Sequence, residues 1–268
     1  MKKILIIGKK SFTGSHLKIK LSKSYHVKSL SINDALKKNI LFFKKFTHVI
    51  NTTIHKSYIF KKYNKKFDFD RLFINKFNKI NFIYIFFNTR KIYSPKFNIT
   101  ENSLIKPQDT YAKNKLITER FLLSKIKYNL LSLRISNILG KRLYKDTKKT
   151  HDLFLDNFIN FRKNNKNITV VNNFKDFITI EQFTKIIKKL VLSNSKGIFN
   201  ISLSKKIFIS ELIYWMDKEF YRKIKFLRPS RESFTLSNKK LMKEVKIKLL
   251  KKDLILFSKK IFNNTKFE

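Results

Sequence analysis

Short apolar runs alternate with longer amphipathic segments over the first half of the chain. The runs, rich in Ile, Val, Phe and Leu, are KILIIG, YHVKSLS, HVINTT, NFIYIFF and NLLSLRI. The segments between them, among them 15–23, 34–46 and 111–125, have the spacing of helices with one apolar face. Buried parallel strands joined by helices produce this pattern. It predicts a doubly wound α/β fold built on a parallel sheet.

The second half of the chain is less regular. Apolar spacing predicts helices over residues 151–163, 180–192 and 209–221, and strands at ITVV and GIFNIS. Pro95, Pro107 and Pro229 stand alone, and no Pro- or Gly-rich linker separates the two halves. We therefore expect a small C-terminal subdomain that the chain enters and leaves, rather than a second domain on a linker.

The first apolar run leads into two of the four glycines in the chain, Gly8 and Gly14, within IIGKKSFTGSHL. In a dinucleotide-binding turn the first glycine permits a tight bend, the second lets backbone approach the pyrophosphate, and the third lets helix pack on strand. Gly8 and Gly14 suit the first and third roles, and Ser11 stands where the middle glycine is expected. A strand-to-helix turn without a ligand would give the same pattern, so this segment alone leaves both interpretations open.

Tyr111 and Lys115 lie four residues apart at the start of a predicted helix, so both project from one face. A lysine ammonium beside a phenol stabilises the phenolate and lowers its pKa from about 10 toward the range of an acid–base catalyst. Tyr58 and Lys62 have the same spacing. In a chain this rich in lysine, the pair alone is therefore a weak signal.

Several motifs in a fixed order resemble those of the extended short-chain dehydrogenase/reductase family, the nucleotide-sugar epimerases, dehydratases and reductases. The resemblance covers most of the chain and is carried by IIGKKSFTGSHL, HVINTT, NFIYIFFNTRKIY, PQDTYAKNK, SLRISNILG and KDFITIEQF, with looser matches at GIFNIS and SNKKLMKEV. It implies a dinucleotide-binding Rossmann domain over residues 1–140. It also implies a mostly substrate-binding part over residues 141–268, some segments of which return to the Rossmann sheet.

The resemblance also implies roles for single residues. Tyr111 is the expected general acid or base at a sugar hydroxyl or ketone, while hydride passes to or from the nicotinamide. Lys115 is expected to hold the nicotinamide ribose and to lower the pKa of Tyr111, and Thr89 to orient the same substrate oxygen. Asn137 and Lys175 are expected to bind the substrate near its diphosphate. The expected cofactor-binding residues are Gly8, Ser11, Phe12, Thr13, Gly14, Ser31, Thr52, Thr53, Tyr111 and Lys115.

Some of these residues also have a purely structural interpretation. Thr89 is compatible with an ordinary strand end, and Asn137 with a turn before Gly140. Thr52 and Thr53 are good β-formers in any strand.

Two departures from the family pattern narrow the chemistry. Family dehydratases carry an acidic pair directly after the catalytic Thr, and here those positions are Arg90 and Lys91, so we expect a reductase or an epimerase. NAD preference usually rests on an acid at the end of the second strand. Here that position is Ser31, which permits and slightly favours NADP, unless Asn33 or Asp34 reaches the ribose.

Composition adds a competing interpretation. The chain has 61 Lys and Arg against 18 Asp and Glu, a formal net charge of +43. Such a charge attracts polyanions. The positive residues are nearly all lysine, however, and are spread among many Asn, Ile and Phe, as a strongly AT-biased coding sequence would produce. We therefore favour compositional bias, and a non-enzymatic nucleic-acid-binding protein stays the less favoured alternative.

Other residue types restrict the options further. The chain has no Cys, which excludes disulfides and thiolate metal sites. The histidines have no ligand-like spacing, so we expect no metal site; they are His16, His26, His48, His55 and His151. No run reaches the roughly 20 apolar residues that span a bilayer. We therefore expect no membrane span and a cytoplasmic location.

These observations predict an NAD(P)-dependent reductase or epimerase that acts on a nucleotide-diphosphate sugar in surface-glycan or deoxysugar biosynthesis. A protein of the same fold that acts on another carbonyl substrate, or binds NAD(P) with little turnover, is the main alternative. A homodimer is expected from the resemblance alone.

Overall fold

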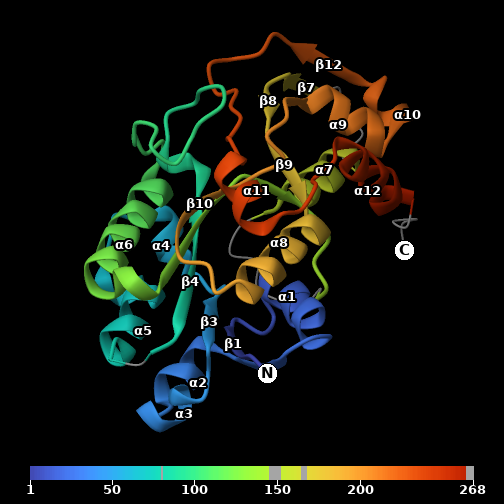
Figure 1. Ribbon diagram of the computed structural model, residues 1–268. Coiled ribbons are helices and arrows are strands. Elements are labelled where there is room, and N and C mark those ends of the chain that lie inside the picture. The colour runs from blue at the N-terminus through green and yellow to red at the C-terminus, as the bar shows by residue number, and fades with distance from the viewer. Residues whose placement is uncertain (80, 145–151, 164–167, 264–268) are drawn as a thin grey trace.

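A computed structural model describes residues 1–79, 81–144, 152–163 and 168–263. Its centre is a six-stranded sheet with the order β10-β5-β4-β3-β1-β2, in which every neighbouring pair is parallel (Figure 1). The strands are β1 (Lys3–Ile7), β2 (His26–Leu30), β3 (His48–Asn51), β4 (Ile83–Thr89), β5 (Leu130–Ile135) and β10 (Gly197–Ile201). All six coincide with apolar runs that the sequence marks as strands, so the predicted doubly wound parallel sheet, a Rossmann fold, is confirmed.

Helices cover both faces of this sheet (Figure 1). One face carries α1 (Phe12–Ser22), α8 (Ile180–Leu192) and α11 (Lys239–Val245). The other face carries α2 (Ile32–Lys37), α3 (Ile40–Lys44), α5 (Phe69–Phe77) and α6 (Thr110–Ile126), and α4 (Lys56–Phe60) packs beside α6. Short 3-10 turns also lie in the described part of this half: η1 (Lys65–Phe67), η2 (Arg90–Ile92) and η3 (Lys127–Asn129).

Successive residues of the first strand point to opposite faces of the sheet. Ile4 and Ile6 are buried in the cluster formed with α1 and α8. Leu5 and Ile7 are buried in the second cluster, which is rich in aromatic residues. Because both faces are covered, each central strand is apolar on both sides, and this explains why the strands appear in the sequence as continuous apolar runs.

The position of β1 between β2 and β3 places a topological switch point at the carboxyl edge of the sheet. The chain leaves β1 toward β2 on one side and continues from β3 to β4 and β5 on the other. In open α/β sheets, ligands bind outside the carboxyl ends of the strands at such a point. The turn after β1 and the ends of β3 and β4 all lie at this edge.

The remaining elements form a second layer of short pairs, drawn from yellow to red at the top and right of Figure 1. The pairs are β6 (Asn137–Leu139) with β9 (Phe177–Thr179), β7 (Ile168–Val171) with β12 (Ile224–Leu227), and β8 (Phe174–Lys175) with β11 (Ile207–Phe208). The helices here are α7 (Phe154–Lys163), α9 (Ile209–Met216), α10 (Lys218–Tyr221) and α12 (Lys251–Asn263). Although β10 and α8 come from the same half of the sequence, β10 is a strand of the central sheet and α8 packs against that sheet. The assignment of residues 141–268 to substrate binding stays a prediction.

Two helices that the sequence predicts as continuous are divided. The segment 34–46 forms α2 and α3, because Asn39 adopts an extended conformation and caps α3 by accepting a hydrogen bond from Phe42 N at 3.0 Å. The segment 209–221 forms α9 and α10, because Asp217 is extended and caps α10. The helix predicted over 151–163 begins at Phe154, and His151 lies outside the described residues.

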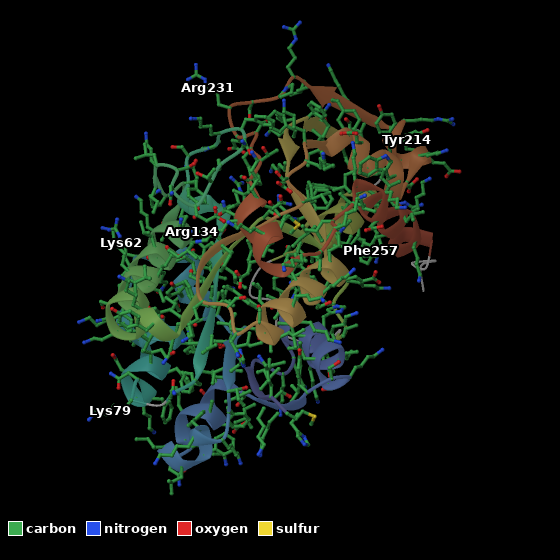
Figure 2. All side chains as sticks on the ribbon, in the orientation of Figure 1. Lys62, Lys79, Arg134, Tyr214, Arg231 and Phe257 are labelled. Atoms are coloured by element: carbon green, nitrogen blue, oxygen red, sulfur yellow. The ribbon has the colours of Figure 1, made fainter. Side chains whose placement is uncertain are left out.

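Charged side chains extend from the molecule on several sides. In Figure 2, Lys62, Lys79 and Arg231 project outward from different parts of the surface, whereas Arg134 lies inside. These three exposed cations come from different parts of the chain, whereas the Arg134 guanidinium is buried in an ion pair.

Candidate active site

The turn between β1 and α1 requires glycine at both predicted positions. Gly8 has a φ of +108°, in the region that side chains rarely adopt, and a Cβ there would lie within 3 Å of Thr52 and Thr53 atoms. A Cβ on Gly14 would lie within 3 Å of Gly8 O, Thr52 Oγ1 and Ser11 Oγ. The two glycines therefore let α1 pack closely against the ends of β1 and β3.

Ser11, which replaces the middle glycine, folds back into this turn. Its Oγ accepts a hydrogen bond from Gly14 N at 3.0 Å and lies 2.6 Å from Thr52 Oγ1. Because the hydroxyl caps α1, it points toward the helix and β3 rather than out of the turn. The N–H groups of Phe12 and Thr13 occupy first-turn positions that have no intrahelical acceptor, at the positive end of the helix. The turn thus fits a bound phosphate despite the serine.

The end of β3 lies directly beside the glycine turn. Thr52 donates from its hydroxyl to Ile7 O at 2.8 Å. Thr53 donates from its N–H and its hydroxyl to Asn51 Oδ1, at 3.0 and 2.6 Å. These bonds fix both threonines next to the turn, where the sequence predicts that they line the cofactor.

Ser31 follows β2 and caps α2. Its Oγ accepts from Asp34 N at 3.1 Å and donates to Asp34 Oδ2 at 2.7 Å. The hydrogen bond from Ser31, followed by the charges of Lys9 and Lys37, lowers the pKa of Asp34. An ionised carboxylate therefore stands beside Ser31 at the end of the second strand.

Thr89 ends β4, and its segment is joined to the start of α6. Thr89 Oγ1 accepts a hydrogen bond from Lys91 N at 3.3 Å. Lys91 Nζ lies 2.7 Å from Asp109 Oδ2, and Asp109 caps α6 by accepting from Ala112 N at 2.8 Å. This ion pair connects the strand end that carries Thr89 to the helix start that carries Tyr111.

Tyr111 lies in the first turn of α6, and Lys115 lies one turn later. Lys115 is 5% exposed, and its pKa is lowered by burial. The pKa of Tyr111 is raised, first by burial and then by the charges of Asp70 and Asp109. In the chain by itself the pKa of Tyr111 is therefore shifted in the direction opposite to the one expected, because burial and two carboxylates all raise it. The lowering of this pKa by Lys115 stays a prediction for the protein with its cofactor bound.

Asp70, a buried acid beside Lys115, is not marked by any of the motifs in the sequence. Its Oδ2 lies 3.8 Å from Lys115 Nζ, and its Oδ1 accepts hydrogen bonds from Asn51 and Tyr84. A local signal was present: Asp70 stands on the apolar stripe of α5, one turn before Phe73 and Ile74. An acid on the buried face of an amphipathic helix needs a partner in the core.

The predicted substrate residues lie together at the boundary with the second layer. Asn137 Nδ2 donates a hydrogen bond to Asp176 O at 3.0 Å. Asp176 is the residue that follows Lys175, so Asn137 and Lys175 lie near each other. Lys175 and Arg90 are half-buried. Burial, followed by the positive charge of Arg90, lowers the pKa of Lys175. The Arg90 guanidinium lies 3.7 Å from the centroid of the Phe234 ring, which holds this cation beside the strand that ends at Thr89.

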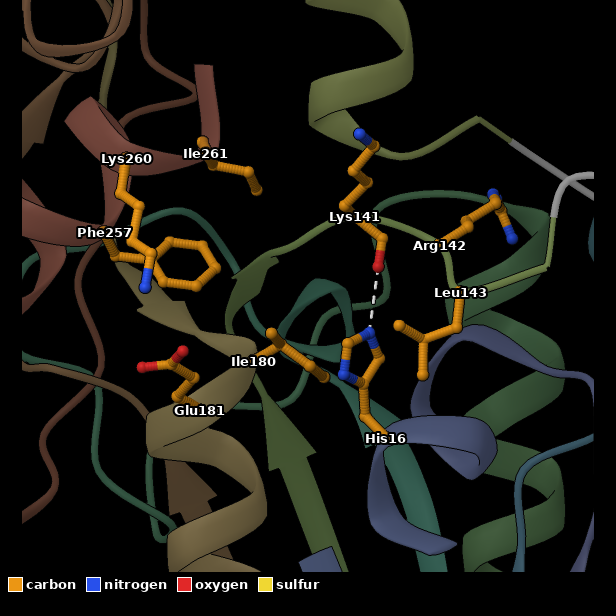
Figure 3. A pocket seen from close by; sticks show the side chains of 9 residues that line it. All are labelled: His16, Lys141, Arg142, Leu143, Ile180, Glu181, Phe257, Lys260 and Ile261. Carbon is orange, nitrogen blue, oxygen red and sulfur yellow. Dashed lines mark hydrogen bonds between the residues drawn. The ribbon is translucent and has the colours of Figure 1, made fainter. Parts of the chain in front are cut away.

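A separate cavity of about 250 Å³ opens elsewhere, between α1, the start of α8 and α12. Figure 3 shows its lining, including the contact of His16 Nε2 with Lys141 O at 2.9 Å. The lining residues are His16, Lys141, Arg142, Leu143, Ile180, Glu181, Phe257, Lys260 and Ile261. None of the predicted catalytic, cofactor or substrate residues is among them, so this cavity is not the candidate active site.

Two kinds of feature are absent from the described ranges. No group of three or more His, Cys, Asp or Glu side chains in them is placed to hold a metal ion. None of the helices that the structure describes is long and apolar enough to cross a membrane.

No protein-family model matches the sequence, and no curated protein matches it. Solved structures match nearly the whole chain. A UDP-N-acetylglucosamine 4-epimerase from Methanobrevibacter ruminantium, in complex with UDP-N-acetylmuramic acid, is 16% identical with a TM-score of 0.78, over 99% of each chain. A dTDP-glucose 4,6-dehydratase from Bacillus anthracis, in complex with NAD, is 12% identical with a TM-score of 0.77, over 99% of this chain and 97% of the other.

A dTDP-4-dehydrorhamnose reductase from Clostridium acetobutylicum is 18% identical with a TM-score of 0.75, over 99% of this chain and 100% of the other. At these identities the likeness establishes the fold. The chain has the Rossmann fold, with its attached second layer, of nucleotide-sugar epimerases, dehydratases and reductases.

Proposed function

We propose that this chain is an NAD(P)-dependent reductase or epimerase of nucleotide-diphosphate sugars and a member of the extended short-chain dehydrogenase/reductase family. One observation carries the proposal. The glycine turn, the Thr89 strand end and the helix start with Tyr111 and Lys115 lie at one edge of a sheet. The fold around them is that of the epimerase and the reductase described above.

The residues at the switch point suit a nicotinamide dinucleotide. The turn from Gly8 to Gly14, with the N–H groups of Phe12 and Thr13, would hold the pyrophosphate, and Lys115 would hold the nicotinamide ribose. When bound, the nicotinamide would supply or accept the hydride. The inward hydroxyl of Ser11 supports this fit, because it leaves the outer side of the turn to backbone.

Tyr111 would then act as the acid–base group at the sugar oxygen. Because its pKa is raised, the phenol carries its proton at neutral pH, which suits protonation of a ketone oxygen as hydride arrives. Thr89 would donate a hydrogen bond to the same oxygen. In an epimerase the same phenol would exchange a proton with the sugar hydroxyl group, so Tyr111 serves either reaction.

Arg90, Lys175 and Asn137 would bind the diphosphate of the substrate. Arg90 and Lys175 are cations on two different segments, close enough that the Arg90 charge acts on Lys175, and an anion between them would relieve that repulsion. Basic residues at positions 90 and 91 also leave no acid for dehydration. These contacts support a reductase or epimerase over a dehydratase.

Asp34 bears on the choice between NAD and NADP. Its carboxylate accepts a hydrogen bond from Ser31 at the place where NAD-binding proteins carry an acid for the ribose hydroxyls. A carboxylate there repels a 2′-phosphate. We therefore propose NAD, whereas Ser31 considered alone favours NADP.

Tyr111→Phe tests the proposed function. With NADH and a nucleotide-linked 4-keto sugar, we expect kcat to fall about 10²–10⁴-fold, because the proton donor is lost, while NADH affinity stays within about threefold. Tyr128→Phe is the matched control, because that phenol is 83% exposed and should be neutral. If Tyr111→Phe turns over at the wild-type rate, Tyr111 is not the acid.

A further inference from the structure

We propose that Asp70 is a positioning residue whose carboxylate, held by two side chains of the central sheet, keeps the Lys115 side chain charged and directed at the carboxyl edge of that sheet. The inference rests on the proposed function, because the edge in question is the proposed nicotinamide site. It adds a residue outside the Tyr111, Lys115 and Thr89 set and gives it a distinct task.

The Lys115 ammonium is buried next to the Asp70 carboxylate. The side chains of Lys115 and Asp70 are each 7% exposed, and Nζ lies 3.8 Å from Oδ2. The ammonium also lies 4.5 Å from the Phe86 ring centroid and 5.7 Å from that of Tyr58. A lysine surrounded by rings and screened from water loses its proton unless an opposite charge is near. Asp70 is the carboxylate in ion-pair distance.

Hydrogen bonds hold the Asp70 carboxylate in a fixed position. Its Oδ1 accepts from Asn51 Nδ2 at 2.8 Å and from the Tyr84 hydroxyl at 2.7 Å. Asn51 ends β3 and Tyr84 lies in β4, so the carboxylate is anchored to two neighbouring sheet strands. Asn51 Oδ1 in turn accepts from Thr53. Hydrogen bonds and one ion pair thus connect the residue beside the glycine turn to the helix that carries Lys115.

Other charged and titratable groups also face the pair of Asp70 and Lys115. Asp68 stands before α5, Tyr58 comes from α4, Tyr84 from β4 and Tyr111 from α6. Asp68 is engaged elsewhere, since it accepts hydrogen bonds from the hydroxyl groups of Thr118 and Tyr63 and from Arg71 N.

The charges within the pair act in known directions. Burial lowers the pKa of Lys115, and the charge of Asp70, followed by that of Asp68, raises it. Burial raises the pKa of Asp70, and the charge of Lys115 opposes that rise. Removing the Asp70 charge must therefore lower the pKa of Lys115.

The test measures NADH affinity by nicotinamide fluorescence from pH 6 to pH 10, at about 0.15 M salt. Affinity falls on the alkaline side when Lys115 loses its proton. In Asp70→Asn we expect this alkaline fall in affinity at a pH about one unit or more lower than in wild type, with affinity near wild type at pH 6. Asparagine keeps an acceptor for Asn51 and Tyr84, and a thermal melt checks folding. Should that variant not fold, Tyr84→Phe, which removes one anchor of the carboxylate, should shift the fall the same way by a smaller amount.

The matched control is Asp217→Asn. Asp217 is also a buried acid in an ion pair, with Arg162 at 2.6 Å, and it caps α10 in the second layer. Its loss should lower the melting temperature and leave the pH profile unmoved. An Asp70→Asn profile that superimposes on wild type would overturn the inference and leave the proposed function standing. No NADH binding by wild type at any pH would overturn both.

Discussion

A serine hydroxyl can stand in place of a glycine after β1 because of the direction in which it points. Ser11 Oγ is bonded to Gly14 N and Thr52 Oγ1, both within the turn. A side chain held in this way adds a helix cap and takes no space on the outer side, whereas Gly8 and Gly14 have neighbours within 3 Å of any added Cβ. At residue scale, the glycine pattern therefore tolerates a change at its middle position alone.

His48, the first residue of β3, makes the free energy of unfolding depend on pH. It is 1% exposed, its Nδ1 lies 2.9 Å from Thr47 Oγ1, and its Nε2 has no hydrogen-bond partner among the described residues. Burial, followed by the charge of Lys2, lowers its pKa from 6.5 to about 4. The unfolded chain therefore binds the proton more readily. This contribution to stability is complete above pH 6.5 and is lost progressively as pH falls from 6.5 to about 4.

We expect His48 to cost about 2 kcal/mol of unfolding free energy between pH 7 and pH 5, and His48→Leu to remove that loss. Urea unfolding at both pH values measures it. His26→Leu, at an exposed position, serves as the control and should keep the wild-type dependence. Parallel behaviour of wild type and His48→Leu would show that His48 does not titrate in this way.

At the scale of elements, α6 is attached to the sheet by a buried ion pair. Arg134 of β5 donates to both carboxylate oxygens of Glu119, at 3.2 and 2.7 Å, and its side chain also bonds the Tyr93 hydroxyl at 2.6 Å. Ser132 donates to the same carboxylate. The side chains of Arg134 and Glu119 are 4% and 1% exposed. This pair fixes the helix whose first turns carry Tyr111 and Lys115.

Glu119→Gln should lower the free energy of unfolding by about 3–5 kcal/mol, because it leaves the Arg134 charge buried without its partner. Lys91→Met breaks an ion pair whose side chains are 44% and 38% exposed, and should cost less than about 1 kcal/mol. Urea unfolding of both variants compares them. Equal losses would contradict the role assigned to burial.

In the first half of the chain, the sequence predicts elements well where a run is long enough to have a pattern. Each strand of the central sheet has four to seven residues, and each coincides with an apolar run. The two-residue strands β8 and β11 were missed, because two residues carry no period and their pairing is set by the folds around them. The division between α2 and α3 was missed because the Asn39 cap does not disturb the apolar spacing.

The residues of the candidate site also fall into those that the sequence predicts and those that it does not. Motif spacing locates Gly8, Tyr111 and Lys115, because each lies at a fixed place relative to its own strand or helix. Asp70 was not predicted, because its partner Lys115 is 45 positions away and is brought near only when α5 and α6 pack together. The reversed pKa shift of Tyr111 has the same origin, since it depends on burial and on Asp70.

At the scale of the whole molecule, the net charge of +43 adds non-specific attraction to the binding of any anion. A protein of this charge attracts polyanions without a specific site, and that attraction weakens steeply with salt. Contact with a cofactor through backbone N–H groups and hydroxyls depends much less on salt. Salt dependence therefore separates the proposed enzyme from the alternative of a nucleic-acid-binding protein.

The most direct test of the central claim is a titration of the purified protein with NADH and, separately, NADPH, followed by nicotinamide fluorescence at about 0.15 M and about 0.5 M salt. We predict saturable binding of one NADH per chain, tighter than NADPH, nearly unchanged between the two salt concentrations and absent in Gly14→Val. No saturable binding of either dinucleotide, or binding that disappears at the higher salt, would contradict the account.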